Sequence, residues 1–131
     1  MAQHPVELIL LRQLASYLAT PMFLVDAAGT LVYYNEAAEP VLGRRFEDSD
    51  EMVREAWLSA FAPKALDGRP LGDSANPLLA ALAERREQHG ILTIQSLGGG
   101  ERRIEVTAIP LEGTAGRLLG AVAIFWPAEP T

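Results

Sequence analysis

The sequence predicts an α+β fold, in which a five-stranded antiparallel sheet has helices on one face and an N-terminal helix packing on the other. Three observations lead to this fold class. Strand-like runs rich in β-branched and aromatic residues occur at 22–34 and at 91–126, and short turns that contain glycine join them within each region. The residues between these regions have apolar side chains at helical spacing. Residues 4–18 show the same helical spacing.

The N-terminal helix is expected at residues 4–18, with Pro5 in its first turn, where the missing N–H group costs nothing. Its apolar residues span about 200° of a helical wheel, which is wider than the face that one sheet buries. We expect the surplus to pack against the same helix of a second copy across a two-fold axis, which would make the protein a homodimer. The expected dimer interface consists of Leu8, Leu10, Leu11, Leu14, Leu18, Val122, Ile124 and Trp126.

A β-hairpin is expected at residues 22–34, where two apolar runs flank a turn that begins at Asp26 and ends at Gly29. Asn35 follows the second strand. Its side-chain oxygen can accept a hydrogen bond from a backbone N–H group one turn later, so Asn35 is expected to cap a short helix. Gly43 is expected to end that helix after two turns.

The rest of the chain contains two longer helices and three strands. An acidic, solvated link at 46–50 leads into the first of these helices, which Pro63 ends. A turn-rich loop follows, Ser74 or Asn76 caps the second helix, and Gly90 ends it. The elements expected after residue 43 are helices at 50–61 and 76–88 and strands at 91–97, 102–111 and 118–126.

The order of these motifs resembles that of a PAS domain, a small sensory and signalling module. PAS domains open with hydrophobic-Asp-x-x-Gly-x-hydrophobic and continue with Asn-x-Ala-Ala and Leu-Gly. The loop Asp-Gly-Arg-Pro-Leu at 67–71 resembles one found in many bacterial PAS domains. The resemblance covers essentially the whole chain and implies an N-terminal helix at 1–20, a PAS-like domain at 21–127 and a tail at 128–131. The residues that match the opening motifs are Val25, Asp26, Gly29, Leu31, Asn35, Ala37, Ala38, Leu42 and Gly43.

The resemblance implies a role in signal transduction, as a sensor that regulates a protein partner or an output domain. PAS domains commonly dimerise through a leading helix, in agreement with the wide apolar arc of residues 4–18. Most PAS domains pass from the last strand into a helix that drives the output. Here Pro127 and Pro130 preclude a continuous helix within these residues, so an attached output domain and a partner in trans both stay open.

Strand alternation predicts which side chains line the interior. Ile104, Val106 and Ala108 share one face of their strand, and the opposite face carries Glu105. If the interior is open, it suits an apolar or weakly amphipathic molecule such as a fatty acid. If side chains fill it, the domain is a ligand-free module for dimerisation or protein docking. The expected lining residues are Trp57, Phe61, Leu78, Leu82, Ile104, Val106, Ala108, Ala121, Ala123 and Phe125.

No cofactor is expected. Flavin-binding PAS domains resemble one another in a helical cysteine and in amide side chains on the last two strands, whereas this chain has no cysteine and has Ile104 and Phe125 at those strand positions. Haem-binding members use a histidine on the long helix. Here His89 comes just after that helix and is expected to be a semi-exposed cap, with haem ligation the less favoured alternative. His4 lies at the terminus.

The composition excludes several kinds of partner. The net charge is -6 and only 11 residues are Lys or Arg, so a broad phosphate-binding face for nucleic acid is not expected. No apolar run is long enough to span a membrane, and no membrane partner is expected. The absence of cysteine excludes thiol chemistry and cysteine-ligated metal sites, and no metal is expected. Because nothing indicates an oxidising compartment, the expected location is cytoplasmic.

Catalysis is not expected. The sequence has no Gly-x-Ser-x-Gly motif and no pair of acidic residues in an apolar setting. The rival class is a small α+β barrel enzyme of the isomerase type, which needs an acidic residue at an inward strand position. Glu105 has the outward parity, so this class is disfavoured.

Overall fold

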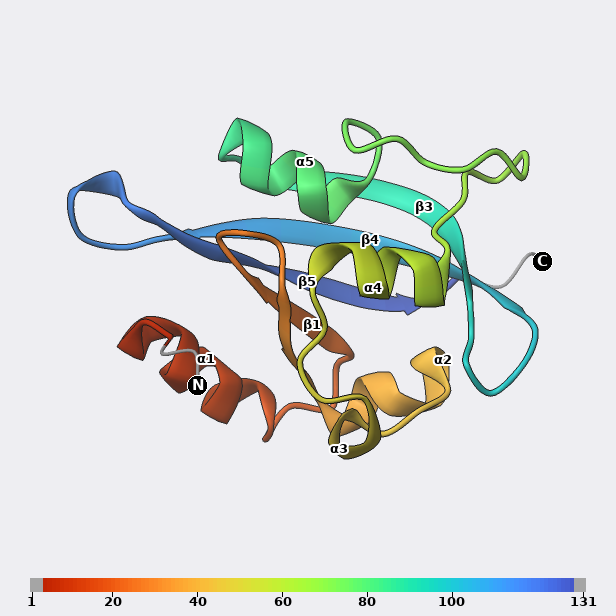
Figure 1. Cartoon of the computed structure of the whole chain (residues 1–131), viewed down its shortest axis with the longest axis horizontal. Coiled ribbons are helices and arrows are strands. Elements are labelled where there is room, and N and C mark those ends of the chain that lie inside the picture. The colour runs from red at the N-terminus through yellow and green to blue at the C-terminus, as the bar shows by residue number, and fades with distance from the viewer. Residues whose placement is uncertain (1–3, 129–131) are drawn as a thin grey trace.

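The structure, a computed structural model, describes residues 4–128, so the expected tail lies outside the described residues from position 129 onward. Helices and strands follow one another in the predicted order (Figure 1). The elements are α1 (Val6–Ala15), β1 (Met22–Asp26), β2 (Leu31–Tyr34), η1 (Glu36–Ala38), α2 (Glu39–Leu42), α3 (Phe46–Ser49), α4 (Arg54–Phe61), α5 (Pro77–Glu84), β3 (Gln88–Gln95), β4 (Glu101–Glu112), η2 (Thr114–Gly116) and β5 (Leu118–Pro127).

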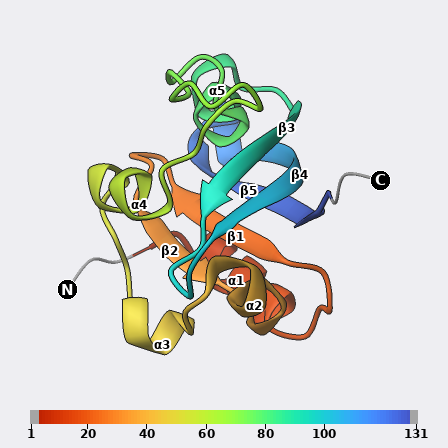
Figure 2. The same cartoon turned by 90° about the vertical axis from the view of Figure 1, so that its right-hand side faces the viewer.

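The five strands form one antiparallel sheet with the order β2-β1-β5-β4-β3. β1 lies beside β5, so the sheet joins the two ends of the chain. In Figure 1, α5 lies above the sheet and α1 lies below it. In the view of Figure 2, the strands run across the middle, with α5 above them and α1 and α2 below. The predicted sheet, with helices on one face and the N-terminal helix on the other, is confirmed.

The hairpin of β1 and β2 forms as predicted. Asp26 Oδ1 accepts hydrogen bonds from the backbone N–H groups of Ala28 and Thr30, both at 3.0 Å, and so closes the turn. Gly29 adopts a φ of +88°, a left-handed conformation that glycine reaches without strain. The turn residues of the sequence therefore determine this connection.

Asn35 is fully buried at the end of β2. Its Oδ1 atom accepts hydrogen bonds from the N–H groups of Ala38 at 3.2 Å and Met22 at 3.0 Å, so it caps η1 as predicted and also holds the start of β1. Its Nδ2 atom donates to the carbonyl oxygens of Ala15 at 3.0 Å and Thr20 at 2.9 Å. One side chain therefore connects α1, β1 and η1.

Gly43 ends α2 in a left-handed conformation with a φ of +83°, as predicted. A Cβ atom at this position would overlap the backbone of Gly98 and the hydroxyl group of Ser96. The N–H group of Leu97 donates to the carbonyl oxygen of Leu42 at 2.8 Å. The turn between β3 and β4 therefore packs directly on the end of α2, where only glycine fits.

The start of the first long helix differs from the prediction. The acidic link at 46–50 is mostly helical, because Phe46 is buried and begins α3, although its acidic side chains are exposed to solvent as predicted. α4 then starts at Arg54, several residues later than expected. Met52 pairs with Leu31 at the edge of the sheet, and this extended bridge keeps the preceding residues out of the helix.

The end of the second long helix also differs from the prediction. α5 ends at Glu84 because Arg85 adopts a left-handed conformation, with φ 56° and ψ 41°. β3 then begins at Gln88, which lies opposite Ala108 in the ladder with β4. Gly90 lies inside β3 and does not end the helix. The last residues that the local pattern assigned to the helix therefore belong to β3, because they pair with β4.

Each edge strand of the sheet carries one bridge from a loop. Leu31 on β2 pairs with Met52, with N–H···O distances of 2.8 and 3.2 Å. Thr93 on β3 pairs with Lys64, with distances of 2.8 and 2.9 Å. These bridges occupy backbone groups that edge strands otherwise leave unpaired.

Two apolar layers pack on opposite faces of the sheet. The larger layer lies under α4 and α5 and contains the aromatic residues Phe23, Trp57 and Phe61. The smaller layer lies between the back of the sheet and α1, where Leu8 and Ala15 are each only 2% exposed. The sheet residues of the smaller layer are Met22, Leu24, Val32, Leu119 and Val122.

Candidate functional site

A cavity of about 70 Å³ lies in the larger apolar layer, between the sheet, α4 and the start of α5. This is the interior that strand alternation assigns to a ligand. The expected residues that the structure places around it are Trp57, Phe61, Leu78, Ile104, Val106, Ala123 and Phe125.

α4 supplies one wall of the cavity. Trp57 and Phe61 lie one turn apart and are both buried. The indole Nε1–H group of Trp57 donates to the carbonyl oxygen of Gly29 at 2.8 Å, which satisfies the one polar atom of this ring. Phe23 on β1 packs edge-on against both rings, with centroid distances of 5.2 and 6.2 Å. This wall is aromatic and is attached to the hairpin turn.

The sheet supplies the opposite wall. Val106 on β4 lies opposite Phe125 on β5, and Ile104 and Ala123 line the same cavity. Glu105 alternates to the outer face and is exposed. The predicted parity of these strands is therefore correct. Glu105 is not the buried acidic residue that an isomerase-type enzyme would need at this strand position.

Three expected lining residues do not line the cavity, and their assignment is corrected. Ala108 and Ala121 are fully buried in the layer where α5 packs directly on β4 and β5, so their small side chains bring the elements together instead of leaving space. Leu82 is half-buried and lines a separate, larger hollow of about 430 Å³ beside Arg54 and Asp73. Asp73 is mostly exposed, so this hollow lies at the surface.

Sequence reasoning missed several lining residues. The alternation rule applied to β3 would find Leu92 and Ile94, which are buried while their neighbours are more exposed. Leu42, Pro63 and Pro77 reach the cavity from helix ends and loops, where no periodicity points inward. The lining residues that were not expected are Phe23, Leu42, Pro63, Asn76, Pro77, Leu92 and Ile94.

The volume of the cavity limits what it can hold. Pockets for drug-sized ligands measure about 300–1,000 Å³, and an apolar cavity of about 150 Å³ holds benzene. The cavity here, about 70 Å³, is smaller than both. A fatty acid therefore does not fit unless the walls move, and the cavity in this conformation suits a compact molecule.

Neither histidine lines the cavity. His89 lies on β3 and shares the outer face with Thr107, whose Oγ1 atom is 3.0 Å from His89 Nδ1. It is not the helix cap that the sequence predicts, because α5 ends at Glu84. His4 Nε2 lies 3.1 Å from Glu51 Oε2. Both imidazoles therefore have partners away from the cavity.

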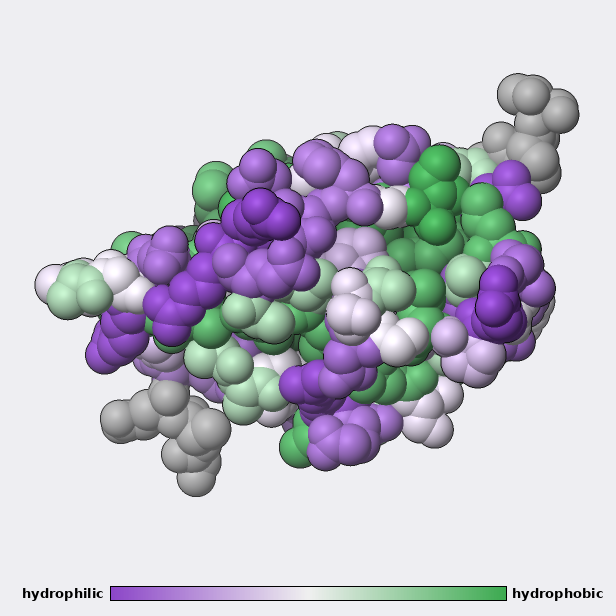
Figure 3. Space-filling view, turned by 90° about the horizontal axis from the view of Figure 1, so that it is seen from above, coloured by the Kyte–Doolittle hydropathy of each residue, from purple (hydrophilic) through white to green (hydrophobic). Residues whose placement is uncertain are grey.

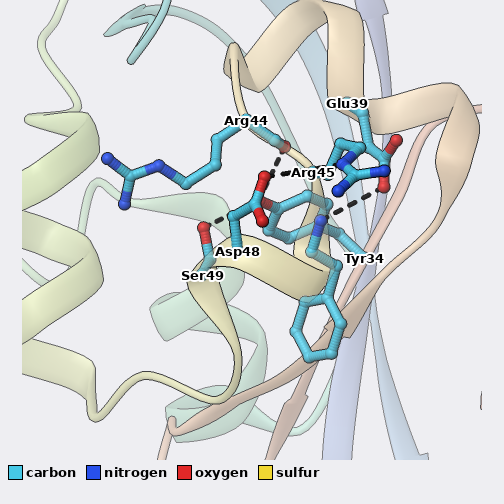
Figure 4. A network of polar contacts seen from close by, with 7 residues as sticks. Tyr34, Glu39, Arg44, Arg45, Asp48 and Ser49 are labelled. Atoms are coloured by element: carbon cyan, nitrogen blue, oxygen red, sulfur yellow. Dashed lines mark hydrogen bonds and ion pairs between the residues drawn. The ribbon is translucent and has the colours of Figure 1, made fainter.

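A polar network surrounds Tyr34, which is fully buried (Figure 4). The Tyr34 hydroxyl donates to the carbonyl oxygen of Arg44 at 2.8 Å and lies 3.0 Å from Ser49 Oγ. Burial raises the pKa of Tyr34, and the hydrogen bond with Ser49 opposes this rise. Glu39 accepts a hydrogen bond from the N–H group of Phe46 at 3.1 Å. These contacts hold α2 and α3 against β2, which is a structural role.

Arg12 connects α1 to the same region. Its guanidinium carbon lies 4.7 Å from the ring centroid of Tyr33 and 5.4 Å from that of Phe46. Contacts of this kind stabilise a cation over the face of an aromatic ring. Burial raises the pKa of Tyr33, and the charge of Arg12 opposes this rise.

The outer face of α1 and of the turn after it is apolar and exposed. Leu10, Leu14 and Leu18, which the sequence assigns to a dimer interface, are 58%, 55% and 43% exposed. Leu8 and Val122, which the sequence also assigns to it, are buried within the chain because they pack α1 on the sheet. That part of the expected interface is corrected. The exposed set, called the apolar α1 face below, is Val6, Ile9, Leu10, Leu14, Tyr17 and Leu18.

The back of the sheet beside α1 is partly apolar as well. Leu11 of α1 and Ile124 of β5, which the sequence assigns to the dimer interface, are half-buried against the smaller apolar layer. Trp126, which the sequence also assigns to the dimer interface, lies outside that layer and is 39% exposed. Ile91 and Ile109 on the neighbouring strands are also exposed. By contrast, hydrophilic residues cover much of the face over α5, to the left and centre of Figure 3.

Residues 4–128 contain neither a helix that could span a membrane nor a cluster of metal-binding side chains. None of the helices there is both long enough and apolar enough to cross a bilayer. No group of three or more carboxylate or imidazole side chains in that part of the chain could hold a metal ion.

A family model described as the PAS fold matches residues 18–128. No curated protein matches the sequence. The fold is similar to the PAS domain of nitrogen regulation protein NR(II) from Vibrio parahaemolyticus, with 19% identity, a TM-score of 0.64 and coverage of 91% of this chain and 98% of that one. A PAS domain from a two-component sensor histidine kinase is 13% identical, with a TM-score of 0.63 and coverage of 94% and 97%. The Rhodobacter sphaeroides LOV protein is 14% identical, with a TM-score of 0.71 and coverage of 95% and 69%.

Proposed function

This chain belongs to the PAS fold family, and we propose that it is a non-catalytic sensory and signalling module that works as a homodimer. The observation that carries the proposal is the apolar α1 face. More than half of the exposed large apolar side chains in residues 4–128 belong to the segment 6–18. A PAS domain from a two-component sensor histidine kinase has the same fold, which supports a role in regulating a protein partner or an output domain.

A second copy of the chain is the partner that best fits the apolar α1 face. Contiguous apolar surface of this kind marks interaction sites. Leu10 and Leu14 lie one turn apart, so they present one continuous stripe. Two copies related by a two-fold axis bury the same stripe on both protomers at once.

Light scattering at tens of micromolar tests the dimer. We expect twice the monomer mass for the wild type and a lower mass for Leu14→Gln, because a polar amide replaces an exposed apolar side chain in the interface. The matched control is Leu66→Gln. Leu66 is 50% exposed in the loop between α4 and α5, away from α1 in Figure 1, and this variant should remain dimeric. A monomeric wild type, or a dimer unaffected by Leu14→Gln, would contradict the proposal.

The proposed sensory input is a compact, largely apolar molecule in the cavity. The second candidate is a ligand-free module for dimerisation or protein docking, and the cavity volume of about 70 Å³ favours it. Thermal-shift measurements with small apolar molecules of benzene size or below separate the two, because binding to the native state raises the unfolding midpoint. An unchanged midpoint across the panel would leave the ligand-free module.

We infer that the domain does not use flavin or haem. The chain has no cysteine, and Ile104 and Phe125, which line the cavity, replace the amide side chains that flavin-binding relatives are expected to have. Neither histidine faces the cavity. The purified protein should therefore be colourless, and a visible absorption band of either cofactor would overturn this inference.

A further inference from the structure

Asn76 is the one lining residue of the cavity that carries a side-chain amide. The indole N–H of Trp57 is already bonded to Gly29, and every other lining side chain is a hydrocarbon. Asn76 is only 6% exposed. The cavity therefore has an apolar lining with one polar side chain, the amide of Asn76, and buried polar groups of this kind normally have hydrogen-bond partners.

The helix cap fixes the orientation of this amide. Asn76 Oδ1 accepts hydrogen bonds from the N–H groups of Leu78 at 3.0 Å and Leu79 at 3.4 Å. Because both partners are donors, the oxygen must face the start of α5, and the Nδ2 atom must point away from it. A flipped amide would bring N–H groups against N–H groups.

The Nδ2 atom is a free donor. Within residues 4–128 it has no hydrogen-bond acceptor, and it is not one of the fully enclosed atoms of the core. It therefore keeps some accessible surface, and Asn76 is one of the residues that line the cavity. A hydrocarbon in the cavity would exclude water from this donor without replacing the lost hydrogen bond, which disfavours purely apolar ligands.

We propose that the cavity selects a compact carbonyl compound, of the ketone, aldehyde or ester class, whose oxygen accepts a hydrogen bond from Asn76 Nδ2. This inference rests on the proposed ligand-binding function. An alcohol of the same shape fits less well, because its hydroxyl proton needs an acceptor and the side chains of the lining offer none. The rest of the ligand contacts the aromatic and aliphatic walls.

Three probes of nearly equal shape test the selection: 2-butanone, 2-butanol and 2-methyl-1-butene. Titrations followed by ¹H–¹⁵N NMR spectra report the affinity, and the side-chain NH₂ signal of Asn76 reports the contact. We expect the ketone to bind about tenfold more tightly than the alkene, as a hydrogen bond of ordinary strength allows, and to shift the NH₂ signal. The alcohol should lie between them.

Two variants isolate the amide. Asn76→Asp and Asn76→Gly both leave an acceptable N-cap for α5, so both should fold, and unfolding midpoints check this. Both remove the N–H donor, so the preference for the ketone over the alkene should disappear. The Gly variant has no side-chain donor or charge, so it provides the test if the carboxylate of the Asp variant disturbs the cavity.

The outcomes separate this inference from the proposed function. If none of the probes binds the wild type, both the carbonyl selection and the ligand-binding role fail. If the ketone and the alkene bind equally, the cavity binds ligands but the assignment of Asn76 is overturned. A ketone preference that survives in Asn76→Gly overturns it too, whereas loss of the preference in both variants supports it.

Discussion

The Nδ2 atom of Asn35 donates to the carbonyl oxygen of Ala15 at 3.0 Å, across the boundary between the sheet and the last turn of α1. The same amide accepts from Met22 at the start of β1. Movement of α1 therefore requires either a change in the hydrogen bonds of a fully buried side chain or a matching movement of β1. α1 carries the proposed dimer face, so this contact would couple the proposed dimer to the sheet that forms one wall of the cavity.

Replacement of Asn35 by Leu should destabilise the protein strongly. The change leaves the N–H group of Met22 and the carbonyl oxygen of Thr20 without a partner, whereas Ala38 N–H and the Ala15 carbonyl oxygen keep a backbone hydrogen bond. We expect the free energy of unfolding in urea to fall by about 3 kcal/mol or more, because each orphaned buried group costs about 1–3 kcal/mol. Ser16→Ala is the control, since it removes only an exposed hydrogen bond at the same helix end. Equal losses in the two variants would contradict the role of Asn35.

Replacement of Gly43 by Ala should cost more than replacement of Gly68 by Ala. Both glycines have left-handed backbones, with φ values of +83° and +91°. Gly43 packs against Gly98 and Ser96, whereas nothing lies within 4 Å of a Cβ atom at Gly68. Urea unfolding should show a loss of about 1 kcal/mol for Gly68→Ala from backbone strain alone and a clearly larger loss for Gly43→Ala. Similar losses would show that the packing at Gly43 is loose.

The stability of the protein should decrease at alkaline pH because of Tyr34. Burial raises the pKa of Tyr34 in the folded state, so the folded protein holds the phenol proton more tightly than the unfolded chain. This contribution is complete below the pKa of an unfolded tyrosine, about 10, and is lost as the pH rises through the folded pKa. Urea unfolding between neutral and strongly alkaline pH measures the decrease.

Tyr34→Phe should reduce that alkaline decrease, although it also lowers the stability at neutral pH by removing the bond to Arg44. Burial raises the pKa of Tyr33 as well, so Tyr33→Phe should remove a further part of the decrease. The same alkaline slope in the wild type and in Tyr34→Phe would show that Tyr34 does not carry the effect.

Replacement of Trp57 by Phe tests the aromatic wall of the cavity. The variant loses the 2.8 Å hydrogen bond to the carbonyl oxygen of Gly29 and leaves additional space beside Phe23. We expect a loss of about 2–4 kcal/mol in the free energy of unfolding and an increased affinity for compact apolar molecules. Trp126→Phe is the matched control. Because Trp126 is 39% exposed, its replacement should change the stability far less.

Local chemistry was enough to predict the elements whose ends depend on short-range contacts. Asn35 and Gly43 act on backbone groups within a few residues, so the cap and the helix end could be recognised from the sequence. The helix boundaries that were predicted wrongly depend on residues that are distant in the sequence. The start of α4 depends on pairing between Met52 and Leu31, and the end of α5 depends on pairing with β4.

The cavity shows the same division. Strand parity predicted Ile104 and Phe125 because alternation is a local property of a strand. Asn76 was recognised only as a helix cap. Its place in the cavity lining depends on an open space that no sequence pattern describes. A helical wheel predicted a surplus of apolar surface on α1. It could not tell that Leu8 faces the sheet while Leu10 remains exposed.

The bridges of Met52 and Lys64 at the two margins of the sheet have a consequence for how copies of this protein can assemble. Lateral stacking of strands, by which fibres grow, meets one occupied backbone position on each edge strand. The proposed dimer would use the apolar α1 face instead, where a two-fold contact buries the same surface on both copies, so that growth would stop at a pair.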